Sequence, residues 1–305
     1  MKVYNIKKET INKFTSLLNN SSDFKETVQG LWEKELSSPE WCFVIEEKGK
    51  LMGRVGYWAS KDEKENIRIF GLLLPWERKD TLSIGKRLLN ESIEMMKKQG
   101  AKTVNYQLHS DEKGNLALKK ELLETVGMEN IQKKKSFYLE KNSFNSVNQN
   151  RLTYKSLEEI GEEKFIGIIK KVTRETLDKE DELSVLNFGA EEHARNHFND
   201  LKSIDFSPEN WFIAYNKNNI IGLVIPQKFN NKVGAINYIG VISEERGQGY
   251  VIDLLDKGIK NLFERDVSKI IADIDVQNFP MENALLKSGF NEEKKIYVYD
   301  FTLKK

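Results

Sequence analysis

The sequence predicts a mixed α/β (α+β) fold made of two similar halves, each with a mixed, mostly antiparallel sheet flanked by helices. Three observations support this prediction. The same order of helical and strand patterns occurs twice, and an Asn- and Ser-rich segment, residues 141–150, divides the 305 residues nearly in half. The apolar spacing also agrees, because Leu88 lies 16 residues before Val104 and Leu254 lies 16 residues before Ile270. We therefore expect a duplicated unit of about 140 residues.

Turn residues and apolar periodicity locate the elements of the first half. Helices are expected over residues 10–19, 23–36, 81–99 and 116–125, and strands over residues 41–46, 51–58, 67–74, 103–108 and 132–139. The helix over 81–99 has the clearest pattern, because Leu82, Leu89 and Met96 recur on one stripe and Gly100 ends it. We assign residues 1–140 to the first domain.

The second half repeats this order. Helices are expected over residues 163–172, 190–201, 251–263 and 281–288, and strands over residues 211–215, 220–227, 233–242, 269–276 and 294–303. Asn and Ser favour turns over regular ladders, so residues 141–150, with four Asn and two Ser, form the expected linker. Residues 151–305 are then the second domain.

Composition limits the class of protein. Lys and Arg total 48 against 47 Asp and Glu, so a net charge of +1 gives no general electrostatic case for nucleic acid or an anionic membrane. The single cysteine, Cys42, excludes an intrachain disulfide and a cysteine-cluster zinc site. The chain also lacks a signal-peptide pattern and an apolar run of the roughly 20 residues that a membrane span needs. We expect a cytoplasmic protein, a monomer or homodimer, with neither nucleic acid nor membrane as partner.

A glycine-containing turn in the second half is the first feature that indicates chemistry. The strand ending at Ile242 leads into Ser-Glu-Glu-Arg-Gly-Gln-Gly-Tyr, residues 243–250, and then into an apolar-striped helix. Gly247 and Gly249 let backbone N–H groups face outward, and the helix start adds free N–H groups and a positive dipole end. This arrangement suits a pyrophosphate, and Arg246 adds a charge-assisted contact. Alone, however, such a turn is also an ordinary strand–helix connection.

A second motif makes the first more specific. Asn278 begins Asn-Phe-Pro-Met, lies 32 residues after Arg246 and precedes Gly289-Phe290 by 11 residues. Together with the Arg-Gly-Gln-Gly loop, this resembles the GNAT-type N-acetyltransferase superfamily over about residues 205–303. Val251 departs from the Gly or Ala that is usual in the family at that position. There is neither a Gly-Lys-Ser/Thr phosphate loop nor a third glycine for a dinucleotide fingerprint.

The resemblance implies acetyl-CoA as cosubstrate. It implies that two central strands splay apart at a bulge near residues 239–241, so that pantetheine lies between them against the backbone of Val241 and Ile242. It also implies that Asn278 contacts the cosubstrate near its thioester end. The N–H groups expected to bind the pyrophosphate are those of Arg246, Gly247, Gln248, Gly249, Tyr250 and Val251.

The first half resembles the same fold only through the repeat. Its corresponding loop, residues 74–85, has three extra residues and no Gly-x-Gly. Pro75 lacks an N–H group, and the bulky Trp76 and Glu77 obstruct a phosphate. We therefore expect residues 1–140 to be a degenerate GNAT-like domain without a cofactor site, structural or contributing to the acceptor site.

Transfer to an amine needs a base for the amine and, in this family, a Tyr that protonates the leaving thiolate. That Tyr lies seven residues after the Asn, where this chain has Leu285. Tyr238 is the candidate substitute, with Tyr297 and Tyr299 as alternatives, and each is equally explained as a core residue. The N–H group of Val241 is the expected oxyanion donor.

Asp273 and Asp275 are the candidate acidic residues. They alternate with Ala272 and Ile274, so the aliphatic side chains are expected toward the helix and both carboxylates toward the acceptor. We expect Asp275 to act as the base and Asp273 to help attract a cationic amine, although a merely solvated or paired face explains the same pattern.

Two histidines complete the candidate residues. His193 and His197 lie four apart and share one face of a helix, either at the surface or at the edge of the acceptor pocket. A zinc site needs a third ligand that the pattern does not supply, so no metal is expected.

The expected activity is that of an acyl-CoA-dependent N-acyltransferase, with acetyl as the expected acyl group. The acceptor is a primary amine of a small molecule or peptide, attacking directly in a ternary complex. The alternative is a non-catalytic acyl-CoA-binding sensor or scaffold, which the absent Tyr at position 285 supports.

Overall fold

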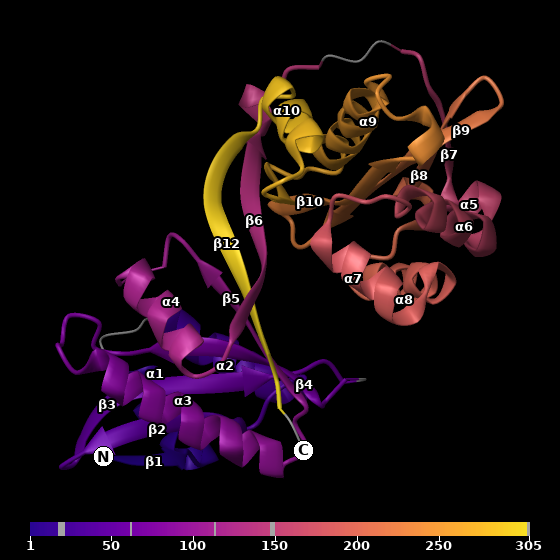
Figure 1. The fold of residues 1–305 in the computed structure, drawn as a ribbon. Helices are drawn as coiled ribbons and strands as arrows, with labels where there is room; N and C mark the ends of the chain where they lie inside the picture. The colour runs from indigo at the N-terminus through magenta and orange to yellow at the C-terminus, as the bar shows by residue number, and fades with distance from the viewer. Residues whose placement is uncertain (18–21, 62, 113, 147–149, 304–305) are drawn as a thin grey trace. The chain divides into compact units, whose positions relative to one another are not determined.

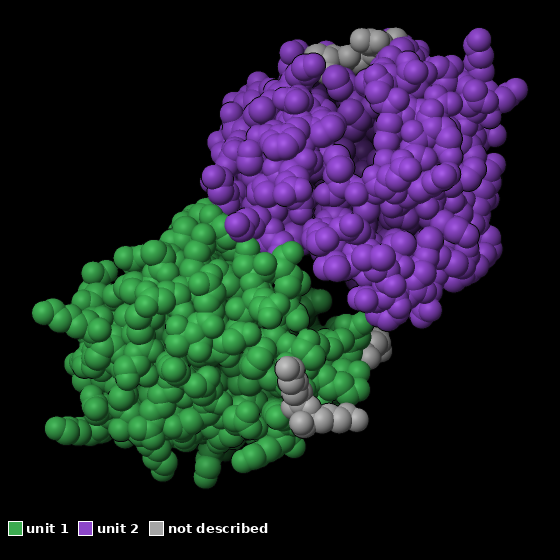
Figure 2. Space-filling view, viewed as in Figure 1, with its two compact units in different colours: residues 1–131, 296–305 green, residues 132–295 purple. Residues whose placement is uncertain are grey.

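The computed structural model describes residues 1–17, 22–61, 63–112, 114–146 and 150–303. The chain divides into two compact units, shown in Figure 2. Unit 1 comprises residues 1–131 and 296–305, and unit 2 comprises residues 132–295. None of the helices in the described residues combines the length and apolar character that crossing a bilayer requires.

Unit 1 contains a mixed sheet in the order β1-β2-β3-β4-β5-β12. All neighbouring strands are antiparallel except β4 and β5, which are parallel. The strands are β1 (Lys2–Asn5), β2 (Cys42–Glu47), β3 (Lys50–Trp58), β4 (Asn66–Leu73), β5 (Thr103–His109) and β12 (Asn291–Thr302). The helices of this unit are α1 (Ile11–Thr15), α2 (Ser22–Glu33), α3 (Thr81–Lys98) and α4 (Leu116–Thr125).

Unit 2 repeats this plan with a sheet in the order β6-β11-β10-β9-β8-β7, in which β10 and β11 are the parallel pair. Figure 1 labels the elements of unit 2 other than β11. The strands are β6 (Glu129–Glu140), β7 (Thr153–Ser156), β8 (Phe212–Asn216), β9 (Asn219–Lys228), β10 (Val233–Val241) and β11 (Lys269–Asp275). The helices are α5 (Leu157–Ile160), α6 (Glu162–Val172), α7 (Lys179–Phe188), α8 (Ala190–Lys202), α9 (Tyr250–Glu264) and α10 (Phe279–Lys287).

Each face of the unit 2 sheet buries a different set of helices. The apolar stripe of α9 packs on one face, with Leu254, Leu255 and Ile259 fully buried against Ile270. Helices α6 and α8 pack on the other face, where Phe165 and Phe198 surround Trp211. These two apolar clusters fix the sheet between them, because buried apolar surface is the main favourable term in folding.

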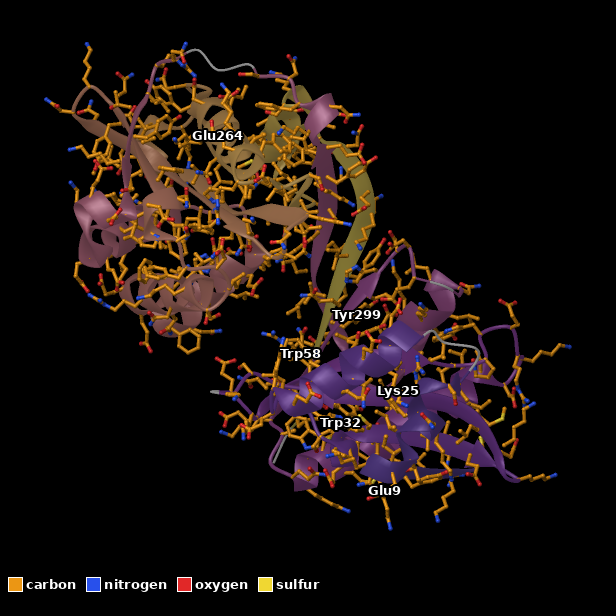
Figure 3. The ribbon with its side chains drawn as sticks, turned by 180° about the vertical axis from the view of Figure 1, so that it is seen from behind. Glu9, Lys25, Trp32, Trp58, Glu264 and Tyr299 are labelled. Atoms are coloured by element: carbon orange, nitrogen blue, oxygen red, sulfur yellow. The ribbon has the colours of Figure 1, made fainter. Side chains whose placement is uncertain are left out.

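The last strand of each half of the sequence pairs with a strand from the other half. Strand β12 pairs with β5 over Ile296–Thr302, and β6 pairs with β11 over Lys134–Glu140. Tyr299, labelled in Figure 3, is 1% exposed and lies in the core of unit 1. Phe137 and Leu139 are fully buried in the core of unit 2.

The two halves therefore have the expected α/β architecture and repeated order, but the compact units do not follow the halves of the sequence. The expected domains, residues 1–140 and 151–305, each contain a final strand that pairs in the other unit. Periodicity cannot reveal this, because both final strands carry the same apolar alternation. Of the expected linker 141–150, residues 147–149 lie outside the described part, and Lys141–Ser143 form a short 3₁₀ turn. Helix α7 was not expected.

Candidate functional site

The turn between β10 and α9 has the backbone shape that the sequence indicates. A 3₁₀ turn, Ser243–Glu245, leads into Gly247 and Gly249, whose φ angles are 81° and 74°. Gly249 is the N-cap of α9 and, having no side chain, makes no capping hydrogen bond to the first N–H groups of the helix. Left-handed φ angles favour glycine, which explains why both residues lack a side chain.

The space beside these glycines is open. A Cβ atom added at Gly247 would have no heavy atom within 4 Å, and one at Gly249 would have only Arg151 Nη2, at 3.9 Å. Two open glycine positions, separated by Gln248, beside a helix N-terminus without a side-chain cap form a backbone cradle for an anion.

Arg246 has a different role from the expected one. Its guanidinium donates hydrogen bonds to the carbonyls of Val241 (3.1 Å), Val172 (2.9 Å), Arg174 (2.8 Å) and Glu175 (2.9 Å). The side chain thus connects the end of β10 with the segment after α6. Its backbone N–H is also directed inward, toward the carbonyl of Ser243 at 3.4 Å. Arg246 therefore holds the loop in place rather than projecting toward an anion.

A second arginine, not identified from the sequence, lies against the loop. Arg151 donates to the Asp253 carboxylate at 2.5 and 3.2 Å and to the carbonyl of Gln248 at 3.0 Å. Its guanidinium also lies 4.7 Å from the centre of the Tyr250 ring. The Tyr250 hydroxyl in turn accepts a hydrogen bond from Asn216 at 2.8 Å. No local motif marks Arg151, since it lies 97 residues before Gln248.

Strands β10 and β11 separate as the resemblance implies. They pair only over Val233–Ala235, so β10 continues for six residues beside no parallel neighbour. The register shift with β9 lies between Ile236 and Tyr238, not near residues 239–241 where it was expected. Pro226, opposite Ile236, has no N–H group to continue the ladder, so the irregularity lies nearer the start of β10 than expected.

Backbone groups of β10 face the gap at alternate residues. The Ile242 N–H donates to the carbonyl of Ile221 at 2.9 Å, so it is directed to β9 and is not free for a ligand. Because backbone groups alternate along a strand, the N–H groups of Val241 and Ile239 are directed away from β9. The expected donor Val241 thus faces the gap, and Ile239 is an additional residue that does so.

Asn278 lies at the other side of this gap, directly after β11. Its Oδ1 accepts the N–H of Met281 at 3.2 Å and caps α10. The cap uses the carbonyl end of the side chain and leaves the amide nitrogen as a donor. The residue where the family has its Tyr, Leu285, is fully buried in the apolar core.

Asp273 and Asp275 lie on the face of β11 away from α9. Ala272 and Ile274, between and before them, pack in the α9 cluster, whereas Asp273 is exposed. Asp275 is 8% exposed, and its Oδ1 accepts the Gln277 N–H at 3.0 Å.

A buried polar cluster occupies the same face of the sheet, beneath α7 and α8. The Tyr238 hydroxyl donates to Asp181 Oδ2 at 3.3 Å, and His193 Nε2 lies 3.5 Å from Asp181 Oδ1. His197 stacks on His193, with ring centres 5.6 Å apart, and its ring centre lies 4.4 Å from that of Tyr238. His193 is thus buried, at 3% exposure, rather than part of a surface face. The other two tyrosine alternatives, Tyr297 and Tyr299, pack against the core of unit 1.

Burial shifts the pKa values of this cluster. Desolvation, reinforced by the carboxylates of Asp178 and Glu180, raises the pKa of Asp181 from 3.8 to about 7. Desolvation also lowers the pKa of His193, and it lowers that of His197 to about 4. The pKa of Tyr238 is raised well above 10 by burial and by Asp181. At neutral pH both imidazoles are therefore uncharged and the phenol keeps its proton.

Sequence reasoning missed Asp181 because it missed α7. The helix has no apolar stripe, and Asp181 is its only buried residue. The available signal was the cap: Asp178 accepts the N–H groups of Glu180 and Asp181, and three acidic residues follow in the first turn. No cluster of three or more His, Cys, Asp or Glu side chains in the described residues could hold a metal ion.

The parallel strands of unit 1 also separate, but side chains fill the region that corresponds to the open loop of unit 2. Strands β4 and β5 pair only over Asn66–Arg68. In the loop after β4, Trp76 is 9% exposed, and a Cβ atom added at Gly114 would lie 2.6 Å from its ring. Lys119, 4% exposed, lies 5.4 Å from the ring centre and pairs with Glu112 at 2.8 Å. A side chain and a buried ion pair thus occupy this part of unit 1.

Comparisons with known proteins agree with this geometry. Residues 176–290 match the family model described as Acetyltransferase (GNAT) family. A search of curated proteins found no match to this chain.

Solved structures match the chain along its length. A GCN5-related N-acetyltransferase from Sphaerobacter thermophilus superposes with a TM-score of 0.68 at 13% identity, covering 100% of this chain and 96% of that one. A tandem GNAT protein from the clavulanic acid biosynthesis pathway gives a TM-score of 0.57 at 13% identity, covering 100% and 99%. Residues 176–290 therefore match the GNAT acetyltransferase family model, and the chain along its length has the fold of tandem GNAT proteins.

Proposed function

We propose that this protein is an N-acyltransferase that uses acetyl-CoA, bound in unit 2, to acetylate a primary amine of a small molecule or peptide. The observation that carries the proposal is the open, uncapped N-terminus of α9 beside the gap between β10 and β11. The amine would attack directly in a ternary complex.

The residues present fit acetyl-CoA. Its pyrophosphate would lie against the N–H groups of residues 247–251, where the two glycines leave open space. Its pantetheine would lie along β10, whose N–H groups at Ile239 and Val241 are directed away from β9. When bound, acetyl-CoA supplies an activated acyl carbon and a thiolate leaving group.

The chain's own residues would then orient the cosubstrate and the acceptor and stabilise the charge that develops during the reaction. The Val241 N–H would donate to the thioester oxygen as it gains negative charge, and the Asn278 amide would hold the cosubstrate from the β11 side. Asp273 and Asp275 would supply negative potential for a cationic acceptor, with Asp275 the sequence candidate for the base. Tyr238, which keeps its proton at neutral pH, stays the candidate in place of the missing Tyr.

We assign no cofactor site to unit 1. Trp76 and the Lys119–Glu112 ion pair occupy the region that corresponds to the open loop of unit 2. The expected stoichiometry is therefore one acetyl-CoA per chain.

Calorimetric titration with acetyl-CoA tests these statements. We expect about one site per chain, lost in Gly249→Glu because the new side chain fills the cradle and its carboxylate repels the pyrophosphate. Gly30→Glu is the matched control: it adds the same charge in α2, where a Cβ meets no heavy atom within 4 Å, and should bind as the wild type does. Absence of binding to the wild type would contradict the proposal, and two sites would contradict the assignment of unit 1.

One observation favours the alternative, a non-catalytic acyl-CoA sensor or scaffold. The position of the family's Tyr is occupied by Leu285, which is fully buried and cannot donate a proton. Release of free thiol that depends on added amine distinguishes the two: an enzyme releases thiol in proportion to acceptor, whereas a sensor binds acetyl-CoA without turnover.

A further inference from the structure

Asp181 is a buried carboxylate with weak compensation for its charge. It is 8% exposed, and its side-chain oxygens meet the Tyr238 hydroxyl at 3.3 Å and His193 Nε2 at 3.5 Å. The first distance is long for an O–H···O bond, and the second exceeds a normal hydrogen bond. The charged groups of the same helix turn, Asp178 and Glu180, repel it. A buried charge normally has a close partner, so this carboxylate is suited to a cation from outside the chain.

The neighbouring imidazoles do not supply that cation. Burial keeps His193 and His197 neutral at pH 7 by lowering their pKa values. His193 Nδ1 is satisfied by Ser184 Oγ at 2.9 Å, but among the described atoms Nε2 of His193 and Nε2 of His197 are buried without a hydrogen-bond partner. His193 is 4% exposed at its side chain and directs Nε2 toward Asp181. Two unsatisfied ring nitrogens beside a carboxylate with only long contacts indicate a polar ligand with several N–H donors.

The cluster lies beside the gap where acyl transfer is proposed. Tyr238 is on β10, beyond its last pair with β11 and three residues before Val241, or about 10 Å along an extended strand. On the same face, the positive charge of Lys134 on β6 interacts with the carboxylates of Glu180 and Asp273. Because the Tyr238 hydroxyl contacts Asp181, this carboxylate lies beside the same stretch of β10 that carries the oxyanion donor.

Asp181 is better placed than Asp275 to hold the acceptor's ammonium group. The Asp275 carboxylate already accepts the Gln277 N–H at the end of β11, so one of its oxygens is occupied, and Asp273 is exposed. Asp181 is enclosed by Tyr238 from β10, by His193 and His197 from α8, and by the acidic turn of α7. Lys134 from β6 is the cation whose charge also acts on it.

Resting on the function proposed above, we propose that Asp181 holds the ammonium group of the acceptor and takes its proton, with His193 and Tyr238 as the residues that position it. One N–H bond of the ammonium breaks, and its proton bonds to a carboxylate oxygen of Asp181, leaving a neutral amine with a free electron pair. That pair forms the C–N bond to the acyl carbon as the C–S bond breaks and its electrons leave on sulfur. The second proton of the nitrogen goes to the sulfur, so Tyr238, whose hydroxyl donates to Asp181, serves here to position the carboxylate and not as the acid. Asp181 returns its proton to solvent.

Comparison of two isosteric variants tests the assignment through the pH dependence of kcat/KM. The wild type should lose activity below about pH 7, where Asp181 becomes protonated. This fall is the acidic limb of the pH profile. Asp181→Asn should lower kcat/KM at pH 8 by roughly 100-fold or more and abolish the acidic limb, while it binds acetyl-CoA within about twofold of the wild type. Asp275→Asn should keep the limb. The reverse assignment, with the limb lost in Asp275→Asn and kept in Asp181→Asn, would overturn the proposal.

A binding measurement without turnover separates this inference from the proposed function. The chain has three histidines, so isotope-labelled imidazoles give three assignable signals. Titration with butylammonium chloride should shift the signals of His193 and His197 in the wild type and not in Asp181→Asn, with sodium chloride at equal ionic strength as control. Glu182→Gln, an exposed residue of the same helix, should behave as the wild type does. No shift in the wild type would refute ammonium binding at Asp181, even if acetyl-CoA binds.

A conservative variant covers the case in which Asp181→Asn fails to fold. The Tyr238 hydrogen bond lowers the pKa of Asp181, so Tyr238→Phe should move the acidic limb of kcat/KM to higher pH. An unmoved limb would contradict the link between the hydroxyl and the carboxylate. If the wild type binds no acetyl-CoA, the proposed function falls, and the imidazole titration alone decides the ammonium site.

Discussion

At the scale of single residues, the loop before α9 is shaped by two left-handed glycines and by the side chain of Arg246. Gly247 and Gly249 have the left-handed φ angles that their position in the motif implied. Arg246 was expected to contact an anion, yet all its bonds go to backbone carbonyls. The difference arises because three of the four carbonyls belong to residues more than 70 positions earlier, and no local pattern reveals such partners.

Arg246→Gln should therefore act through the shape of the loop. A glutamine cannot reach four carbonyls, and hydrogen bonds from a charged donor contribute about 1.5–3 kcal/mol each. We expect acetyl-CoA affinity to fall about tenfold and amide exchange to increase over residues 172–175. Arg174→Gln removes an equally charged but exposed neighbour and should change neither. Unchanged exchange over residues 172–175 in Arg246→Gln would contradict a positioning role.

Asp181 should make unit 2 less stable at alkaline pH. Its pKa is about 7 in the folded protein against 3.8 for an ordinary Asp, so between these values the folded state binds more protons than the unfolded state. Stability is then lost as pH rises through this window, by up to about 4 kcal/mol. Asp181→Asn should be more stable than the wild type in urea unfolding at pH 8, with the advantage disappearing toward pH 4. An equal difference at both pH values would exclude this linkage.

At the scale of elements, periodicity found the longer helices and strands that bury an apolar face. It missed the short strands β1 and β7, the short helix α5, and helix α7, which buries a carboxylate. Helix α9 was expected from its stripe of Leu and Ile, and its core residues are fully buried. Helix α7 exposes Leu186 and Phe188 and buries Asp181, which is the reverse of an amphipathic pattern. Capping at Asp178 was the signal that remained, and it specifies only where a helix begins.

Two substitutions at Asp178 should separate its cap from its charge. Asp178→Ala removes the acceptor of two N–H groups and should cost about 1 kcal/mol and increase amide exchange across α7. Asp178→Asn keeps the cap, so amide exchange across α7 should stay unchanged. It removes a negative charge that raises the pKa of Asp181. The acidic limb of kcat/KM should then move to lower pH in Asp178→Asn. Equal exchange in both variants would show that the cap does not hold α7.

At the scale of the whole molecule, the repeat was readable but the pairing of its last strands was not. Both β6 and β12 are twelve-residue strands that end their half of the chain. Each satisfies the same ladder pattern, so local propensity gives no preference between a partner in its own half and one in the other. The choice is made by packing, in which Tyr299 fills the core of unit 1 and Phe137 that of unit 2. Long-range burial of this kind leaves no trace in a single sequence.

The pairing of β12 in unit 1 and of β6 in unit 2 predicts which unit each of two core substitutions destabilises. Tyr299→Ala should destabilise unit 1 by about 3–5 kcal/mol, because it empties a site in that core and removes the hydroxyl that donates to Glu124 at 3.3 Å. Phe137→Ala should destabilise unit 2 by a similar amount. Hydrogen exchange resolved by peptide should therefore increase over β5 and α4 in the first variant and over β11 and α9 in the second. Acetyl-CoA affinity should fall in Phe137→Ala and persist in Tyr299→Ala. If each strand instead paired within its own half, both effects would be reversed, because Tyr299 would then support unit 2 and Phe137 would support unit 1.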